Sequence, residues 1–117
     1  MKTEDRIIKF IEEKIHQIYR RPLMFGGSAS GTNLLLFAYF EVWAINFGKL
    51  QEFKTSRENL LKDLNCGAAD FSTKFRKDHP TASEKDIAII IVEHWKKIGN
   101  DIGLSIPTIE CIREKTV

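Results

Sequence analysis

The stretch from Leu34 to Phe47 limits the possible folds more than any other feature, because Glu41 and Asn46 are its only strongly polar residues. A membrane-spanning helix needs about 20 consecutive apolar residues, whereas this stretch has fourteen and carries a charge near its middle. A helix with so little polar surface is normally covered by other elements on most sides. We therefore expect residues 34–47 to form the central helix of a soluble domain.

Two longer segments have the apolar spacing of amphipathic helices that can close around such a centre. Between residues 87 and 102 the spacing favours a helix, although the β-branched run 89–92 would also suit a buried strand. Shorter helices are expected after Thr55, around Phe71 and from Ile106 onwards. The sequence thus predicts an all-α fold, a compact bundle of about five to six helices forming a single domain over residues 1–117. The two apolar stripes are Ile7, Ile8, Ile11, Ile15, Ile18 and Tyr19, and Ile87, Ile91, Trp95, Ile98 and Ile102.

Capping residues and helix breakers set the expected ends of these helices. Thr3 is the expected cap of the first helix, and Pro22 is expected to stop it. The small-residue stretch 25–31 is expected to be a loop, after which Thr32 caps the central helix. Two further helix starts are expected at sequences with the form of a capping box, Thr55-Ser56-Arg57-Glu58 and Thr81-Ala82-Ser83-Glu84.

Charge and cysteine spacing argue against several functions. The 18 basic and 16 acidic residues leave a formal charge of +2, far below the concentrated positive field that generic nucleic-acid binding requires. Cys66 and Cys111 are distant and neither belongs to a C-x-x-C pair, which argues against a disulfide framework or a zinc ribbon. Charges interrupt every apolar stretch between Met1 and Leu23, so we expect no secretory signal and a cytoplasmic location.

The candidate patterns for catalysis or ligand binding are incomplete. Glu13-x-x-His16 has the spacing found in di-iron helix bundles, but those need two such motifs and two further carboxylates. Gly26 and Gly31-Thr32 have the glycine spacing of a phosphate-binding loop without its lysine, and they follow a helix rather than a strand. We therefore expect no metal, no cofactor and no enzymatic activity. The histidines are also scattered, without a local nucleophile-and-base pattern: His16, His79 and His94.

Glu41 is the most informative single residue, because a carboxylate in an apolar helix needs a paired charge, a partner-facing edge or a raised pKa. Helices joined by a short connection are expected to pack antiparallel. Arg20 or Arg21, at the end of the first helix, is then the expected counter-charge. In the other interpretation, Glu41 lies at an edge of the domain that faces a partner.

The run Arg20-Arg21-Pro22-Leu23-Met24-Phe25-Gly26-Gly27, followed by an apolar helix with Glu41-Val42-Trp43, resembles an R-P-x-M-aromatic-x-G pattern. This pattern is typical of small helical immunity proteins from bacterial polymorphic-toxin and contact-dependent growth inhibition systems. The resemblance covers roughly residues 15–45. It implies that the matching residues form a corner that shapes the fold, with Met24 and Phe25 tucked under the loop. The matching residues are Arg21, Pro22, Met24, Phe25 and Gly27.

The resemblance implies an immunity protein that binds a cognate toxin domain, such as a nuclease, and blocks its active site or the access of its substrate. The alternative is a helical regulatory or nucleic-acid-binding module, which would use the basic clusters at residues 74–77 and 96–97. An enzyme that binds a small anion at the glycine-rich loop is a third interpretation. For the immunity protein, exposed carboxylates are the candidate partner-binding residues: Glu12, Glu13 and Asp70.

Overall fold

The computed structural model describes residues 3–104, which form an all-α fold as predicted. No strand occurs within this range. The terminal helix expected from Ile106, and the second cysteine, Cys111, lie outside the described residues. The described helices are α1 (Thr3–Arg20), α2 (Pro22–Gly26), α3 (Ala29–Asn46), α4 (Leu50–Leu64), the 3-10 helix η1 (Ala68–Asp70), α5 (Phe71–Asp78) and α6 (Glu84–Asp101).

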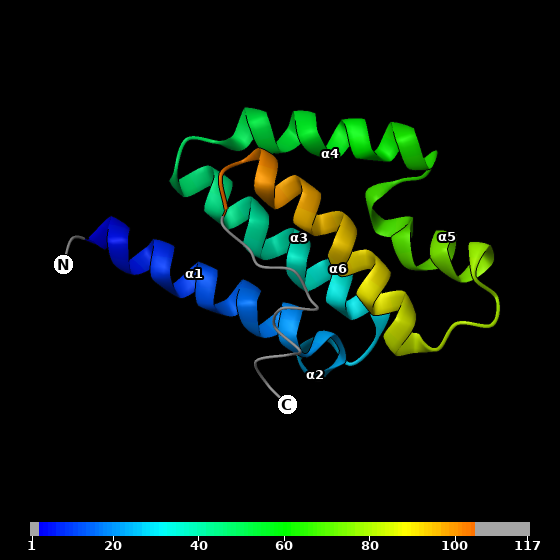
Figure 1. Ribbon diagram of the computed structural model, residues 1–117. Helices are drawn as coiled ribbons and strands as arrows, with labels where there is room; N and C mark the ends of the chain where they lie inside the picture. The colour runs from blue at the N-terminus through cyan, green and yellow to red at the C-terminus, as the bar shows by residue number, and fades with distance from the viewer. Residues whose placement is uncertain (1–2, 105–117) are drawn as a thin grey trace.

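Helix α3 is the centre of the bundle, as its apolar sequence predicts. It packs against α1, α2, α4, α5 and α6, and its strongest contacts are with α2 and α6. Figure 1 shows α1 and α3 side by side with opposite chain directions, and α4 lying across one end of α3 and α6. The antiparallel packing expected from the short connection is therefore present. None of the helices described here combines the length and the apolar character needed to cross a bilayer.

Trp95 on α6 is the hub of the hydrophobic core. Its side chain is fully buried, and its indole N–H donates a hydrogen bond of 2.6 Å to the side-chain oxygen of Asn33 on α3. Ile87, Ile91, Ile98 and Ile102 are buried with it, which confirms that the periodic stripe over residues 87–102 marks a helix. The rings within about 6 Å of Trp95 come from three other helices: Phe37, Phe40, Phe53 and Phe71.

Helix α4 begins five residues before the capping box that was expected to start it. Its first residue is Leu50, so Thr55 and Ser56 lie inside the helix and the prediction is wrong. The physical reason is tertiary packing, because the extra turns bury the ring of Phe53 completely. Ser56 is buried too, and its hydroxyl donates a hydrogen bond of 2.6 Å to a carboxylate oxygen of Asp101 at the end of α6.

The capping box of α6 is real but lies two residues later than expected. Ser83, rather than Thr81, is the N-cap: its hydroxyl accepts a hydrogen bond from the backbone N–H of Asp86, and its own backbone N–H donates one to the Asp86 carboxylate. Glu84, which the expected capping box would have used, instead makes contacts with other helices. Its carboxylate accepts hydrogen bonds from the guanidinium of Arg76 on α5 and from the backbone N–H of Ala29 at the start of α3. One side chain therefore links α6 to two other helices.

The bonds to Glu84 predict a pH dependence of stability. The hydrogen bonds from Arg76 and Ala29 lower the pKa of Glu84 below its ordinary value. A lowered folded-state pKa contributes stability above the unfolded-state pKa of about 4.3, and this contribution is lost as the pH falls through the folded-state value. We expect Glu84→Gln to be less stable than the native chain in urea unfolding at pH 7, with the difference shrinking towards pH 3. A difference that is constant over this range would contradict the charge-based explanation.

Candidate functional site

The corner between the first and third helices contains the residues of the R-P-x-M-aromatic-x-G pattern. Pro22 opens the short helix α2 and is buried, a position where the missing N–H and fixed φ of proline are tolerated. Gly27 ends α2 with φ +73°, in the left-handed region that favours glycine. Pro22 and Gly27 thus lie at the two ends of α2, where the chain passes from α1 to α3.

The expected loop over residues 25–31 is much shorter in the structure, because α2 and α3 take most of it. Only Gly27 and Ser28 lie between these helices. Ser28, rather than Thr32, caps α3, since its hydroxyl accepts a hydrogen bond of 3.0 Å from the backbone N–H of Gly31. Thr32 is buried inside the first turns of α3, and its hydroxyl is hydrogen-bonded to the carbonyl oxygens of Pro22 and Ser28. It therefore ties α3 back to α2.

Gly26 and Gly31 allow the backbones of α2 and α3 to touch at this corner. A Cβ atom added to Gly31 would overlap the carbonyl group of Gly26, and one added to Gly26 would overlap the backbone of Thr32 and Gly31. No side chain fits at either position without a shift of the backbone. These two glycines thus serve the close packing of α2 against α3.

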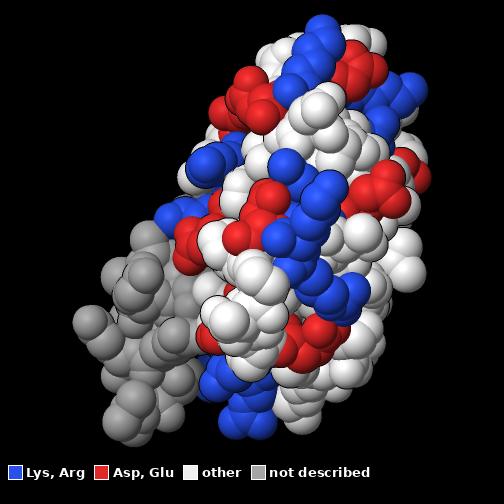
Figure 2. Space-filling model, turned by 90° about the vertical axis from the view of Figure 1, so that its right-hand side faces the viewer, with Lys and Arg blue, Asp and Glu red and all other residues white. Residues whose placement is uncertain are grey.

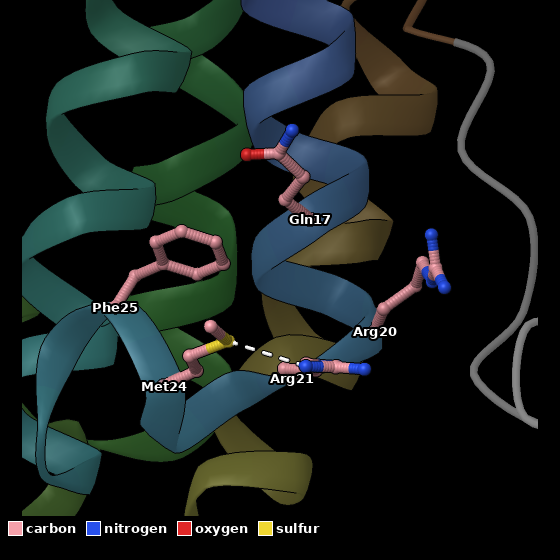
Figure 3. Close-up of a pocket in the computed structure, with 5 residues that line it drawn as sticks. All are labelled: Gln17, Arg20, Arg21, Met24 and Phe25. Carbon is pink, nitrogen blue, oxygen red and sulfur yellow. Dashed lines mark hydrogen bonds between the residues drawn. The ribbon is translucent and has the colours of Figure 1, made fainter. Parts of the chain in front are cut away.

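Met24 and Phe25 are exposed, which contradicts the expectation that they tuck under the loop. Met24 is 63% exposed and Phe25 is 45% exposed. The reason is that the five residues 22–26 form a helix, whose opposite side carries the buried Pro22. Figure 3 shows Phe25 between α1 and α3, and Met24 with its sulfur next to a guanidinium nitrogen of Arg21, 3.6 Å away. Arg20 points away from them.

Exposed Met24 and Phe25 lie at one end of a row of three surface hollows, which we call the α1–α3 groove. The hollow at the corner has a volume of about 240 Å³. It shares Gln17 and Phe25 with a middle hollow, and the middle hollow shares Tyr39 with the largest one, of about 540 Å³. The remaining residues that line them are Arg6, Ile7, Phe10, Ile11, Lys14, Ile18, Arg20, Arg21, Met24, Leu35, Val42 and Asn46.

The exposed large apolar side chains of residues 5–104 all belong to α1, α2 and α3. They include Phe10, which is 55% exposed, and Val42, which is 45% exposed, and both line the groove. Leu34 and Ile45 extend this surface along α3 outside the groove. Helix α3 is therefore central, as expected, yet it also has an apolar outward face, so more of its surface is exposed than its apolar sequence predicts. Clustered exposed apolar groups are typical of interaction surfaces.

The described residues that line the groove carry charges of one sign only. Four of these side chains are cationic and none is a carboxylate. One of the four, Lys14, places its ammonium group 5.5 Å from the centre of the Phe10 ring. This cation–π contact is worth about 0.5–1 kcal/mol at an exposed site. The four cations are Arg6, Lys14, Arg20 and Arg21.

Glu41 forms no ion pair with Arg20 or Arg21, so the predicted pairing is wrong. Among the side chains that the structure describes, the ion pairs are Lys74–Asp78 and Arg76–Glu84. The antiparallel packing explains the failure. Arg20 and Arg21 lie at the corner where α3 begins, whereas Glu41 is twelve residues into α3, which is about 18 Å along its axis. Glu41 is half-buried instead, next to exposed Val42.

The carboxylates proposed as partner-binding residues do not form one surface. Glu12 and Glu13 lie on α1, whereas Asp70 ends η1 next to α5, on the other side of the molecule in Figure 1. None of the three lines the groove. In the basic cluster at residues 74–77, Lys74 and Arg76 are paired with Asp78 and Glu84. Figure 2 likewise shows basic and acidic groups intermixed over the face that contains α5.

Several titratable groups lie outside the groove. Among the described residues, no three His, Cys, Asp or Glu side chains lie close enough together to hold a metal ion. Burial, and then the charge of Asp70, raise the pKa of the Cys66 thiol, which keeps it protonated and poorly nucleophilic. Burial also raises the pKa of Tyr19, with a smaller effect from Glu93. His94 is held by a contact of 2.7 Å between its Nδ1 and the carbonyl oxygen of Ile90.

Comparison with protein-family models, with curated proteins and with solved structures gives no match for this chain. The site is therefore defined by its own geometry, which is a basic, apolar surface groove on an all-α domain.

Proposed function

We propose that this chain is an immunity protein that acts in the cytoplasm by binding a cognate bacterial toxin domain. Binding would block the active site of the toxin or the access of its substrate, and it would need no cofactor and no catalysis by this chain. The observation that carries the proposal is the α1–α3 groove, where exposed apolar side chains gather on one surface of an otherwise charged molecule. Surfaces of this kind are typical of protein-binding sites.

Two independent observations support this proposal at the same place. The residues that resemble the immunity-protein pattern form the corner at one end of the groove, and three of them, Arg21, Met24 and Phe25, line it. Aromatic and methionine side chains are enriched at the centre of protein interfaces. Their exposure in the unbound chain leaves apolar area that a partner can bury. Such burial is favourable by about 25 cal/mol per Å² of apolar surface.

The alternative, a helical regulatory or nucleic-acid-binding module, gains little from the surface charges. Its main basic cluster is ion-paired on α5 and α6, and the groove presents apolar groups between its cations. Nucleic-acid binding would depend steeply on salt, because phosphate contacts release counterions. A gel-shift titration with duplex and single-stranded DNA at physiological salt distinguishes the two functions, and a salt-sensitive shift would favour the alternative.

Co-expression with a toxin tests the proposed function. A large secreted-toxin gene that ends immediately upstream would support the proposal, and its C-terminal domain is the toxin domain to use. We expect growth to be restored by this chain, and we expect the two proteins to co-purify as a stable pair through size-exclusion chromatography. A toxin domain from an unrelated gene cluster is the control, and it should remain lethal. Failure of both growth rescue and co-purification would refute the proposal.

A further inference from the structure

The length of the α1–α3 groove matches a single helix of a partner. Its lining runs along α1 from Arg6 to Arg20, which is about 21 Å at the helical rise of 1.5 Å per residue. On α3, the lining residues Leu35, Tyr39 and Val42 recur at helical spacing. Two adjacent helices thus provide a straight channel that a third helix of about 15 residues can follow.

From this shape and from its charges we infer that the groove binds an amphipathic helix of the toxin domain with an apolar stripe flanked by carboxylates; this inference rests on the proposed function. The apolar stripe would bury Phe10, Phe25 and Val42, which are all about half exposed in the unbound chain. The carboxylates would face the cations of the groove, Lys14 and Arg21 among them, where no acidic side chain of the lining competes. Opposite charges of this kind favour encounter and fix the register of the partner.

Two other occupants fit the groove less well. An extended peptide would gain no ladder of backbone hydrogen bonds, because residues 3–104 contain no strand whose edge could receive it. A second copy of this chain, packed about a twofold axis, would place the same basic groove against itself. The four cations of each copy would then oppose one another, with no carboxylate in the lining to balance them. A helix has all its internal backbone groups satisfied and can supply the missing negative charge.

Two synthetic helical peptides test the inference on the full chain. Both have about 15 residues and the same leucine stripe, and they differ only in carrying Glu or Lys beside it. We expect the Glu peptide to bind about tenfold more tightly than the Lys peptide in fluorescence anisotropy, and to weaken as salt is added. Equal binding of the two peptides would overturn the inference.

Two variants of α3 locate the binding surface. Val42→Glu places a carboxylate in the groove. It is expected to weaken the binding of the Glu peptide about tenfold. Leu34→Glu is the matched control, since Leu34 is an exposed apolar residue of the same helix outside the groove. It should change binding by less than about twofold. Equal losses from both variants would contradict binding in the groove. Circular dichroism checks that both variants fold.

A charge reversal gives a second test that does not depend on the α3 variants. Lys14→Glu combined with Arg21→Glu changes two side chains of the lining that lie on the surface. The doubly substituted chain is expected to prefer the Lys peptide, whereas an unchanged preference would refute the assignment of the carboxylates. Size-exclusion chromatography of the native chain is also informative. A dimer that Val42→Glu dissociates would show that a second copy occupies the groove.

The inference and the proposed function can fail separately. If the toxin domain co-purifies with this chain and Val42→Glu weakens the pair no more than Leu34→Glu does, the function stands and the groove assignment fails. If the Glu peptide binds as expected but no toxin domain is neutralised, the groove assignment stands and the immunity function fails.

Discussion

Replacing Trp95 with alanine is expected to lower the free energy of unfolding by about 3–5 kcal/mol. Trp95 is fully buried among aromatic rings from α3, α4 and α5, and its N–H bonds to Asn33. The substitution removes this packing and leaves a cavity that helices on several sides cannot close. A domain of this size is stable by only about 5–15 kcal/mol, so the variant would be close to unfolding at 37 °C.

Urea unfolding followed by circular dichroism measures this effect. Leu34→Ala is the matched control, because Leu34 is 65% exposed on the central helix. It should change the free energy of unfolding by less than about 0.5 kcal/mol. A similar loss in both variants would mean that Leu34 is covered in solution. A loss below about 1 kcal/mol for Trp95→Ala would contradict its role as the hub of the core.

Gly31→Ala is expected to destabilise the chain by about 3 kcal/mol, at the upper end of the range for overpacking. The added Cβ would overlap the carbonyl group of Gly26, and a backbone group cannot rotate away as a flexible side chain can. The corner between α2 and α3 must therefore open. Because Met24 and Phe25 lie on this corner, the variant is also expected to bind the Glu peptide more weakly.

Gly48→Ala separates this overlap from the general cost of replacing a glycine. Gly48 has φ +66° and nothing within 4 Å of an added Cβ, so the expected loss is only the cost of a left-handed residue, about 1 kcal/mol. Thermal unfolding of both variants, followed by circular dichroism, gives the comparison. If Gly31→Ala lowers the stability of the chain no more than Gly48→Ala does, then the close approach of α2 and α3 does not stabilise the corner.

The sequence predicts the long helices well, because apolar residues spaced three and four apart mark the side of a helix that faces the core. Helix starts are predicted less well. Helix α4 begins at Leu50 after an N-cap residue, Lys49, whose side chain makes no capping bond, so tertiary packing alone sets its first turns. Helix α2 was missed because Pro22 was interpreted only as a stop, although proline is also favoured at the first position of a helix.

The α1–α3 groove could not be predicted from the sequence. Residues 34–47 are apolar on nearly every side, so their pattern does not say which side the other helices leave uncovered. Leu36 and Leu34 are two positions apart and chemically identical, yet one is fully buried and the other is 65% exposed. The number and length of the neighbouring helices decide this, and both are tertiary properties. Only the exposed Met24 and Phe25 carried a signal, through the pattern to which they belong.

The first turn of α3 is anchored by three separate contacts. Ser28 caps it, the carboxylate of Glu84 accepts a hydrogen bond from the N–H of Ala29, and the hydroxyls of Ser30 and Ser72 lie 2.7 Å apart. The conformational entropy of this turn is therefore lost when the chain folds and not when a partner arrives. A partner would meet a preorganised corner, and association is expected to proceed as the docking of two nearly rigid bodies, with side-chain adjustments but little backbone rearrangement.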